Sequence, residues 1–225
     1  MTFSIAARCP RTGRFAIAVC SSSPAVAARC AHARAGVGVA ASQNITDPTL
    51  GHRLLDLLAQ GRSATDALAE IQRTTALLEF RQLTVVDRLG GVAAWSGPRT
   101  VGMHASALGA GAVAAGNLLA NAEVPAAMVC AFEQARADDL GDRIIRAMAA
   151  GRDAGGEAGP VHSAGMLIVD QVAWPVADLR VDWTEGDPVV ELGALWQRWK
   201  PQLDDYVTRA LDPASAPAYG VPGNR

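Results

Sequence analysis

Residues 1–23 read MTFSIAARCPRTGRFAIAVCSSS, and this stretch determines how the fold begins. Apolar residues alternate with small or polar ones on both sides of Cys9–Gly13, a segment with the composition of a turn. We predict a β-hairpin in which position i faces roughly position 23 − i, so that Thr2 lies level with Ser21. The serine run at residues 21–23 then ends beside the start of the chain.

The same stretch carries a candidate nucleophile. Removal of Met1, which the small side chain of Thr2 permits, would leave a hydroxyl and a free α-amine on one residue. An unperturbed α-amine has a pKa of about 7.7 to 8.0 and can therefore accept the hydroxyl proton near neutral pH. Threonine activated by its own N-terminal amine is a recognised type of nucleophile. The alternative interpretation is an ordinary first strand without a catalytic role.

The composition favours one large domain and excludes several classes of partner. With 225 residues, half of them hydrophobic, and a net charge of −2, the chain can bury a substantial core. We expect a single domain at residues 1–211 and a tail rich in Pro, Ala and Gly at 212–225. No run of basic residues and no apolar span of about 18 residues is present, so we expect neither a nucleic-acid nor a membrane partner.

Lysine and cysteine usage narrows the chemistry further. Lys200 is the only lysine and lies in an amphipathic helical pattern, which argues against a lysine beside the nucleophile. The four cysteines show no CxxC spacing and no clustering with histidine, and they are found at Cys9, Cys20, Cys30 and Cys130. We therefore expect reduced thiols, a cytoplasmic location and no metal or other cofactor.

Periodicity and capping signals predict the remaining elements. Strands are expected at residues 35–42, 83–86, 92–95, 100–103, 163–169 and 174–183, and a loop at 105–116. Helices are expected after Asp47, after Ser63, at 124–136, at 140–152 and at 189–211 with a kink at Pro201. This order fits an α+β fold in which two mainly antiparallel sheets lie between helical layers, a four-layer αββα sandwich.

Five segments in this order resemble one known family. They are Met1–Arg8, Ala33–Val39, Arg81–Asp87, Gly116–Leu119 and Gly155–Glu157. Together they are similar to the family catalogued as domain of unknown function 1028 (DUF1028), which is grouped with the N-terminal nucleophile (Ntn) hydrolases. The resemblance implies the αββα fold and, by analogy with the superfamily, hydrolysis of an amide bond by Thr2. The chain departs from the commoner pattern at Cys9 and at 160–163, which indicates a different substrate.

The leading hypothesis is an Ntn amidohydrolase acting on a small amide or cyclic amide. Thr2 would be the nucleophile, and backbone N–H groups or the amide of Asn44 or Asn117 would hold the oxyanion. The remaining candidates would orient the amine or bind the substrate, and they are Ser21, Ser22, Ser23, Gln43, His162 and Ser163. His162 and Ser163 are adjacent on a predicted strand and face opposite ways, which argues against a catalytic pair.

Two other hypotheses remain open from the sequence. The first is a catalytically silent binding or assembly protein that keeps the fold, for which a retained Met1 would be the sign. The second is a cysteine-based enzyme that uses Cys20 or Cys30, although neither has a histidine or acid at an interpretable spacing. The Ala-rich helix surfaces and the Pro-rich tail suggest a homodimer.

Overall fold

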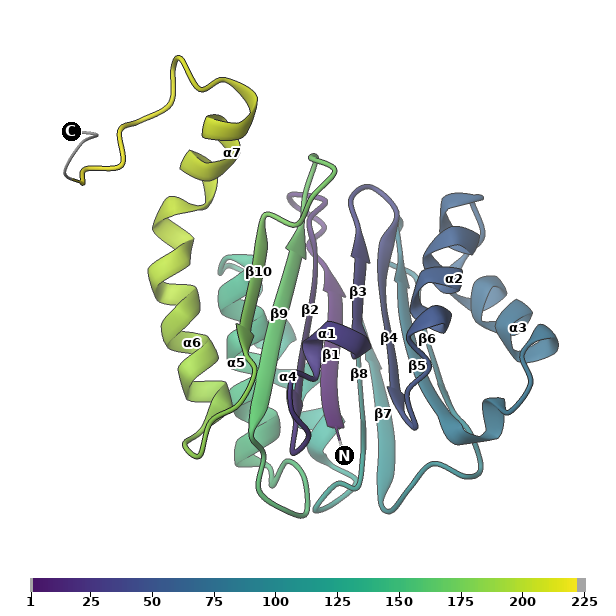
Figure 1. Ribbon diagram of the computed structural model, residues 1–225. Helices are drawn as coiled ribbons and strands as arrows, with labels where there is room; N and C mark the ends of the chain where they lie inside the picture. Colours follow the sequence, from purple (N-terminus) through teal and green to yellow (C-terminus); the bar gives the residue numbers. More distant parts are fainter. Residues whose placement is uncertain (1, 222–225) are drawn as a thin grey trace.

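A computed structural model describes residues 2–221 and arranges them in four layers, with two sheets between two layers of helices (Figure 1). The strands are β1 (Thr2–Arg8), β2 (Phe15–Ser21), β3 (Ala31–Arg34), β4 (Gly38–Asn44), β5 (Arg81–Asp87), β6 (Val92–Ser96), β7 (His104–Gly109), β8 (Ala112–Asn117), β9 (Ser163–Val169) and β10 (Ala177–Val181). The helices are α1 (Ala27–Cys30), α2 (Pro48–Ala59), α3 (Ala64–Thr74), α4 (Val124–Gln134), α5 (Leu140–Asp153), α6 (Pro188–Trp199) and α7 (Leu203–Leu211), with 3₁₀ turns η1 (Leu78–Phe80) and η2 (Lys200–Gln202). The predicted α+β class and αββα layering are confirmed.

The first strand lies in the interior of the larger sheet. That sheet has the strand order β10-β9-β2-β1-β8-β7, and the smaller one has the order β3-β4-β5-β6. Neighbouring strands pair antiparallel throughout the described part of the chain. In Figure 1, α4, α5 and α6 cover the outer face of the larger sheet on the left, and α2 and α3 cover the smaller sheet on the right.

Three hydrophobic cores separate the four layers. The first fills the space between α4, α5, α6 and the larger sheet and contains Phe3 and Trp196. The second lies between the two sheets and contains Ile17 and Val39. The third lies between the smaller sheet and α2 and α3, around Leu54. Each sheet is therefore buried on both faces, which explains why its strands are rich in small apolar residues.

The first hairpin forms in the predicted register. Phe3 pairs with Cys20, so the paired numbers add to 23, and the same register places Thr2 next to Ser21. Phe3 belongs to the core under the helices, whereas Ala6 belongs to the core between the sheets. Because side chains alternate along a strand, Thr2 shares the face of Ala6 and points toward the second sheet.

Local capping signals correctly predict where two helices begin. Asp47 accepts a hydrogen bond from the backbone N–H of Thr49 at the start of α2, and Pro48 occupies the first turn. Ser63 Oγ accepts one from the N–H of Asp66 at the start of α3. These are the orphan donors of a first helical turn, and capping them typically contributes about 1 kcal/mol. Helices α4 and α5 also lie where periodicity predicts them.

The predicted strand at 35–42 is wrong at its start. The strand β4 begins only at Gly38, because residues 35–37 form a turn in which Gly36 has a φ of +68°. The preceding residues form α1 and β3, and β3 pairs with β4 in a short hairpin. Both elements are four residues long, too short to give a periodic signal.

The loop predicted at 105–116 is also wrong, since these residues form nearly all of β7 and β8. Strand β8 lies between β1 and β7, where its single glycine, Gly116, allows close packing. A Cβ on Gly116 would lie 2.5 Å from Leu119 Cδ2. The glycine at this position therefore marks a closely packed strand and not the predicted loop. Residues 100–103, predicted as a strand, lie in a bend before β7.

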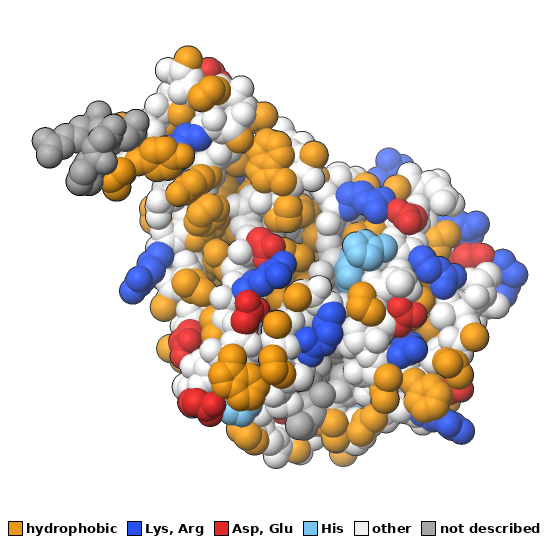
Figure 2. Space-filling view, in the orientation of Figure 1, with side chains coloured by type: hydrophobic (Ala, Val, Ile, Leu, Met, Phe, Trp, Pro, Cys, Tyr) orange, Lys and Arg blue, Asp and Glu red, His pale blue; other side chains and the backbone are white. Residues whose placement is uncertain are grey.

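The C-terminal helix is interrupted as predicted. Helices α6 and α7 are separated by η2, which contains Pro201. Strand β10 covers only part of the predicted range 174–183. Figure 2 shows hydrophobic side chains gathered over these C-terminal helices and the segment that follows them.

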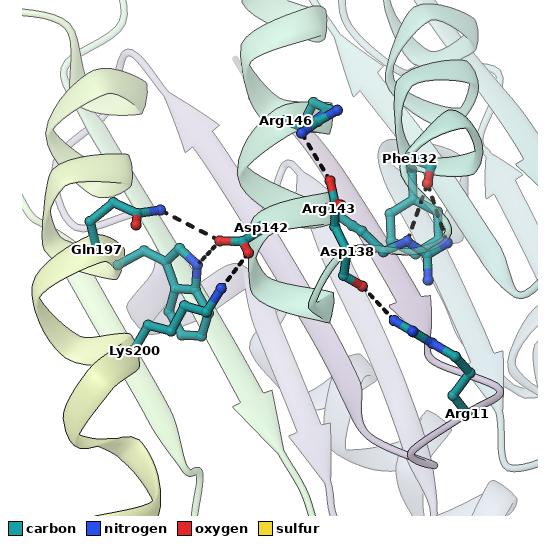
Figure 3. A network of polar contacts seen from close by, with 9 residues as sticks. Arg11, Phe132, Asp138, Asp142, Arg143, Arg146, Gln197 and Lys200 are labelled. Atoms are coloured by element: carbon teal, nitrogen blue, oxygen red, sulfur yellow. Dashed lines mark hydrogen bonds and ion pairs between the residues drawn. The ribbon is translucent and has the colours of Figure 1, made fainter.

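One carboxylate fastens α6 to α5. Asp142 accepts hydrogen bonds from Trp196 Nε1 at 2.8 Å and Gln197 Nε2 at 3.4 Å, and it forms an ion pair with Lys200 (Figure 3). The hydrogen bonds from Lys200, Trp196 and Gln197 outweigh burial and lower the pKa of Asp142. The only lysine of the chain is thus engaged in holding α6 to α5. In the described part of the chain, no helix is both long and apolar enough to cross a bilayer.

Candidate functional site

Thr2 begins β1 between two polar neighbours, and only 4% of its surface is exposed. On one side Thr2 pairs with Asn117, the last residue of β8. On the other side the hairpin register places Ser21, the last residue of β2. The amino end of β1 therefore lies where the ends of both flanking strands meet, facing the space between the sheets.

A buried chain of side-chain amides crosses that space. Ser4 Oγ donates to Gln43 Oε1 at 2.7 Å, and Gln43 Nε2 donates to Gln82 Oε1 at 2.7 Å. Asn117 Nδ2 also donates to Gln82 Oε1, at 3.1 Å. These four side chains are almost fully buried, so the network fixes the spacing of the two sheets below Thr2.

Backbone carbonyls determine the orientation of these amides. Gln43 Nε2 donates to the carbonyl of Ala115, and Gln82 Nε2 donates to the carbonyl of Gly116. Because carbonyls only accept hydrogen bonds, the amide nitrogen of Gln82 must face the carbonyl and its oxygen must face Asn117. Asn117 therefore donates from its amide nitrogen. Asn117 Oδ1 is consequently left over as a buried acceptor, and it has no hydrogen-bond partner among residues 2–221.

The serine run closes one side of the site with a turn. Ser21 Oγ and Ser23 Oγ lie 2.8 Å apart, and Ser21 Oγ accepts from the N–H of Ser23 at 3.1 Å. Ser163, which pairs with Ser21 on β9, donates from Oγ to the carbonyl of Ser23 at 2.6 Å. These serines shape the strand end by bonding to each other, as in an ST turn.

His162 lies beside this turn at the surface. Its N–H donates to the carbonyl of Ser21, and its ring stacks on Trp183 with centroids 4.3 Å apart. Its Nδ1 lies 2.8 Å from the carbonyl of Thr184 and 3.8 Å from a Glu185 carboxylate oxygen. The structure thus brings His162 to the rim of the site but engages its Nδ1 in a loop contact.

Asn44 lies at the end of β4 and is engaged in loop contacts. Its Nδ2 donates to the carbonyl of Phe80 at 2.5 Å, and its Oδ1 accepts from the N–H of Val101 at 3.1 Å. Its φ of +74° lies in the left-handed region, which asparagine tolerates better than most residues. Asn117 is the candidate amide that the structure places next to Thr2.

Glu157 is a functional candidate that the sequence reasoning did not single out. Its side chain is buried, with 5% exposed, and its Oε1 accepts from the N–H of Ser22 at 3.2 Å. Burial raises the pKa of Glu157 to about 7, although the positive charge of the chain's amino terminus, the hydrogen bond from Ser22 and the charge of His162 oppose that rise. The preceding Gly155 and Gly156 have φ of +117° and +54°, a conformation that favours glycine and turns the chain into the site.

Cys20 and Cys30, the two cysteines considered as nucleophiles, are both buried. Burial raises the pKa of the Cys20 thiol well above its usual range, and burial likewise raises the pKa of Cys30. A buried thiol with a raised pKa carries little thiolate, the nucleophilic form. The cysteine-based hypothesis is therefore disfavoured. Within residues 2–221, no group of three or more His, Cys, Asp or Glu side chains is arranged to hold a metal ion.

One surface hollow lies away from Thr2, beside the β9–β10 connection. Its volume is about 560 Å³, and residues of the β9–β10 connection and α7 line it, among them Trp174, Leu203 and Leu211. The region around the first strand is instead closely packed, as the burial of Thr2 shows.

The fold and this site define an αββα protein in which a threonine and a buried glutamate lie at the end of a central strand. The sequence model described as a family of unknown function (DUF1028) matches residues 2–192. The chain therefore belongs to the DUF1028 family. No curated protein sequence matches it.

One solved structure from the same family is similar to most of this chain. Protein SPO2555 from Silicibacter pomeroyi, a DUF1028 protein, is 29% identical, with a TM-score of 0.81 over 88% of each chain. Anbu (ancestral beta-subunit) from Yersinia bercovieri is 11% identical, with a TM-score of 0.40 over 91% of this chain and 97% of the other. The likeness to Anbu is slight and carries no conclusion about function.

Proposed function

We propose that the protein is an N-terminal nucleophile hydrolase that cleaves the amide bond of a small amide or cyclic amide. The observation that carries this proposal is the place of Thr2: it begins an interior strand, faces the space between the sheets and lies next to Asn117 and Ser21. A hydroxyl held in a buried polar setting of this kind can act as a nucleophile when a base is within reach. The α-amine of Thr2 itself supplies that base once Met1 is removed.

The reaction follows from the groups at this strand end. Thr2 Oγ1 attacks the amide carbonyl carbon, and the α-amine accepts the hydroxyl proton and passes it to the leaving nitrogen. Water then hydrolyses the ester on Thr2 by the reverse proton path. The oxyanion needs donors near Thr2, and the amide nitrogen of Asn117 or a backbone N–H of the strand ends would provide them.

The first test combines intact mass with turnover. We expect the purified protein to lack Met1, and a panel of small linear and cyclic amides to reveal a substrate. Thr2→Ala should then reduce kcat to the background rate. Removal of a catalytic nucleophile typically lowers kcat by a factor on the order of 10⁶. Thr2→Ser retains a hydroxyl and an amine and serves as the matched control. Retention of Met1, or equal turnover by Thr2→Ala and the parent, contradicts the proposal.

The burial of Thr2 favours a second candidate function. Only 4% of the surface of Thr2 is exposed in the described structure, so a substrate would need access to a buried residue. A catalytically silent binding or assembly protein would need no such access. Absence of covalent labelling at Thr2 by acylating reagents in a processed protein would support this candidate.

A further inference from the structure

Glu157 lies across the amino end of β1, between the ends of the two strands that flank it. Its backbone forms a bridge with Leu119, two residues after the Asn117 that pairs with Thr2. Its carboxylate accepts from the N–H of Ser22, the residue after the end of β2. The glutamate therefore spans from the end of β8 to the end of β2, over the point at which β1 begins.

Two buried acceptors at this strand end have no donor. Glu157 Oε2 and Asn117 Oδ1 are both inaccessible to solvent and lack a hydrogen-bond partner within residues 2–221. Leaving a buried polar atom without a partner costs about 1–3 kcal/mol, and more when the atom is charged. Both atoms accept hydrogen bonds, and one belongs to a carboxyl group. An ammonium, a cationic donor with several N–H bonds, can satisfy both acceptors at once.

We propose that this strand end is an internal ammonium site, which the α-amine of Thr2 occupies after removal of Met1, and that Glu157 is the positioning residue for that amine. The inference rests on the proposed function for the removal of Met1. In this arrangement the amine donates to Glu157 Oε2 and Asn117 Oδ1. Those contacts fix the direction of its remaining lone pair or proton relative to the Thr2 hydroxyl.

The carboxylate also sets the basicity of the amine. Burial alone would lower the pKa of an amine far below its usual value, because the charged form loses its hydration. A carboxylate within about 4–6 Å acts in the opposite direction, by roughly 1–3 pKa units. The two effects together bring the amine close to neutrality, where a general base works best.

The direction of the pKa shift of Glu157 is consistent with an ammonium partner. Burial raises this pKa, and the positive charge of the chain's amino terminus is the largest of the influences that lower it. Two other titratable side chains face Glu157. His162 lowers the pKa of Glu157, and the Glu157 charge in turn raises that of Cys20. Because these groups would also affect a pH profile of activity, the titration of the amine is followed directly.

The experiment measures the pKa of the Thr2 amine by NMR in protein labelled with [¹³C]threonine. Intact mass first establishes that Met1 is absent, and loss of one resonance in Thr2→Ser assigns the Thr2 Cα signal. We expect Glu157→Gln to lower the midpoint of that signal by one pH unit or more, because the amine loses its counter-charge. The matched control is Glu185→Gln, because the Glu185 side chain lies near His162 but is 81% exposed. In this variant the midpoint of the Thr2 signal should equal that of the parent.

A midpoint that is the same in Glu157→Gln and the parent overturns the inference, and so does retention of Met1. Glu157→Asp keeps the charge on a shorter side chain and should give an intermediate midpoint, which provides a second variant if Glu157→Gln does not fold. The readout requires no substrate. The processed protein could show a lowered midpoint in Glu157→Gln and yet hydrolyse no amide. That result would contradict the proposed function and still support the ammonium site.

Discussion

Individual side chains decide the polarity of each layer in this protein. Along β1 the odd positions face the helices and the even positions face the other sheet, so a change of parity at Thr2 would turn its hydroxyl into the helix-side core. The same strand places Ser4 on the amide network two residues further along. The position of the candidate nucleophile thus depends on the alternation of only a few residues.

His32 gives a prediction about pH at the residue scale. Its ring is buried against Gly51, where a Cβ would lie 2.1 Å from His32 Cδ2. Burial, followed by the charge of His52, lowers the pKa of His32 to about 4. The unfolded chain then binds a proton between pH 6.5 and 4 that the folded protein does not, so stability falls as pH falls through this window.

We expect this histidine to cost up to about 3 kcal/mol of unfolding free energy at pH 4 relative to pH 7. In His32→Phe, which keeps a ring in the space, that part of the acid dependence should disappear. Urea unfolding at a series of pH values measures the difference, and the exposed His104→Phe is the control. Parallel curves for His32→Phe and the parent would show that His32 is protonated in the folded state.

At the scale of elements, β8 holds the candidate site together. It pairs with β1 on one side and β7 on the other, and its last residue is Asn117. Its composition of three alanines, one valine, one glycine and one asparagine gives almost no periodic signal. The strand is small because it is crowded on both faces, by the second sheet on one and by α4 on the other.

Gly116→Ala tests this crowding. The added Cβ would lie 2.5 Å from Leu119 Cδ2 and 3.1 Å from the carbonyl oxygen of Thr2. We expect a loss of about 1–3 kcal/mol in unfolding free energy, as for other overpacked cores. Gly159→Ala, where no atom lies within 4 Å of the new Cβ, should change stability by less than about 0.5 kcal/mol. Similar melting temperatures for the two variants would contradict the packing around β8.

At the scale of the whole molecule, the C-terminal helices attach to the sandwich mainly through α6, whose buried residues are Pro188, Val189, Leu192 and Trp196. Trp196 is buried against α5, where a Cβ on Gly141 would lie 2.2 Å from its ring. Its indole N–H donates to Asp142, which also pairs with Lys200. In α7 only Leu203 is buried. The attachment of the C-terminal region therefore depends on α6.

Trp196→Ala should reduce the unfolding free energy by about 3–5 kcal/mol, the usual cost of deleting a buried tryptophan. The control is Trp174→Ala, since Trp174 is 41% exposed and its loss should cost under about 1 kcal/mol. Denaturant unfolding of both variants gives the comparison. Equal losses would mean that α6 contributes little to the stability of the sandwich.

Part of the candidate site can be predicted from local sequence patterns, and part of it cannot. The register of the first hairpin follows from its turn and alternation, so the nearness of Thr2 and Ser21 is predictable. Asn117 can be named from its residue type, but its pairing with Thr2 requires β8, which its composition conceals. Glu157 contacts Ser22 across 135 residues of chain. In the sequence, the signals for it are the two glycines that precede it and its place in the family segment Gly155–Glu157.

The sequence by itself determined the hairpin register, the starts of α2 and α3, the break at Pro201 and the αββα order of layers, because turns, caps and periodicity act between near neighbours. Only the tertiary structure decided which segments lie beside the first strand. The pairing of β8 and the placement of Glu157 depend on packing between distant parts of the chain, where small residues fit by shape and leave no pattern. That packing is what brings the buried polar atoms together around Thr2.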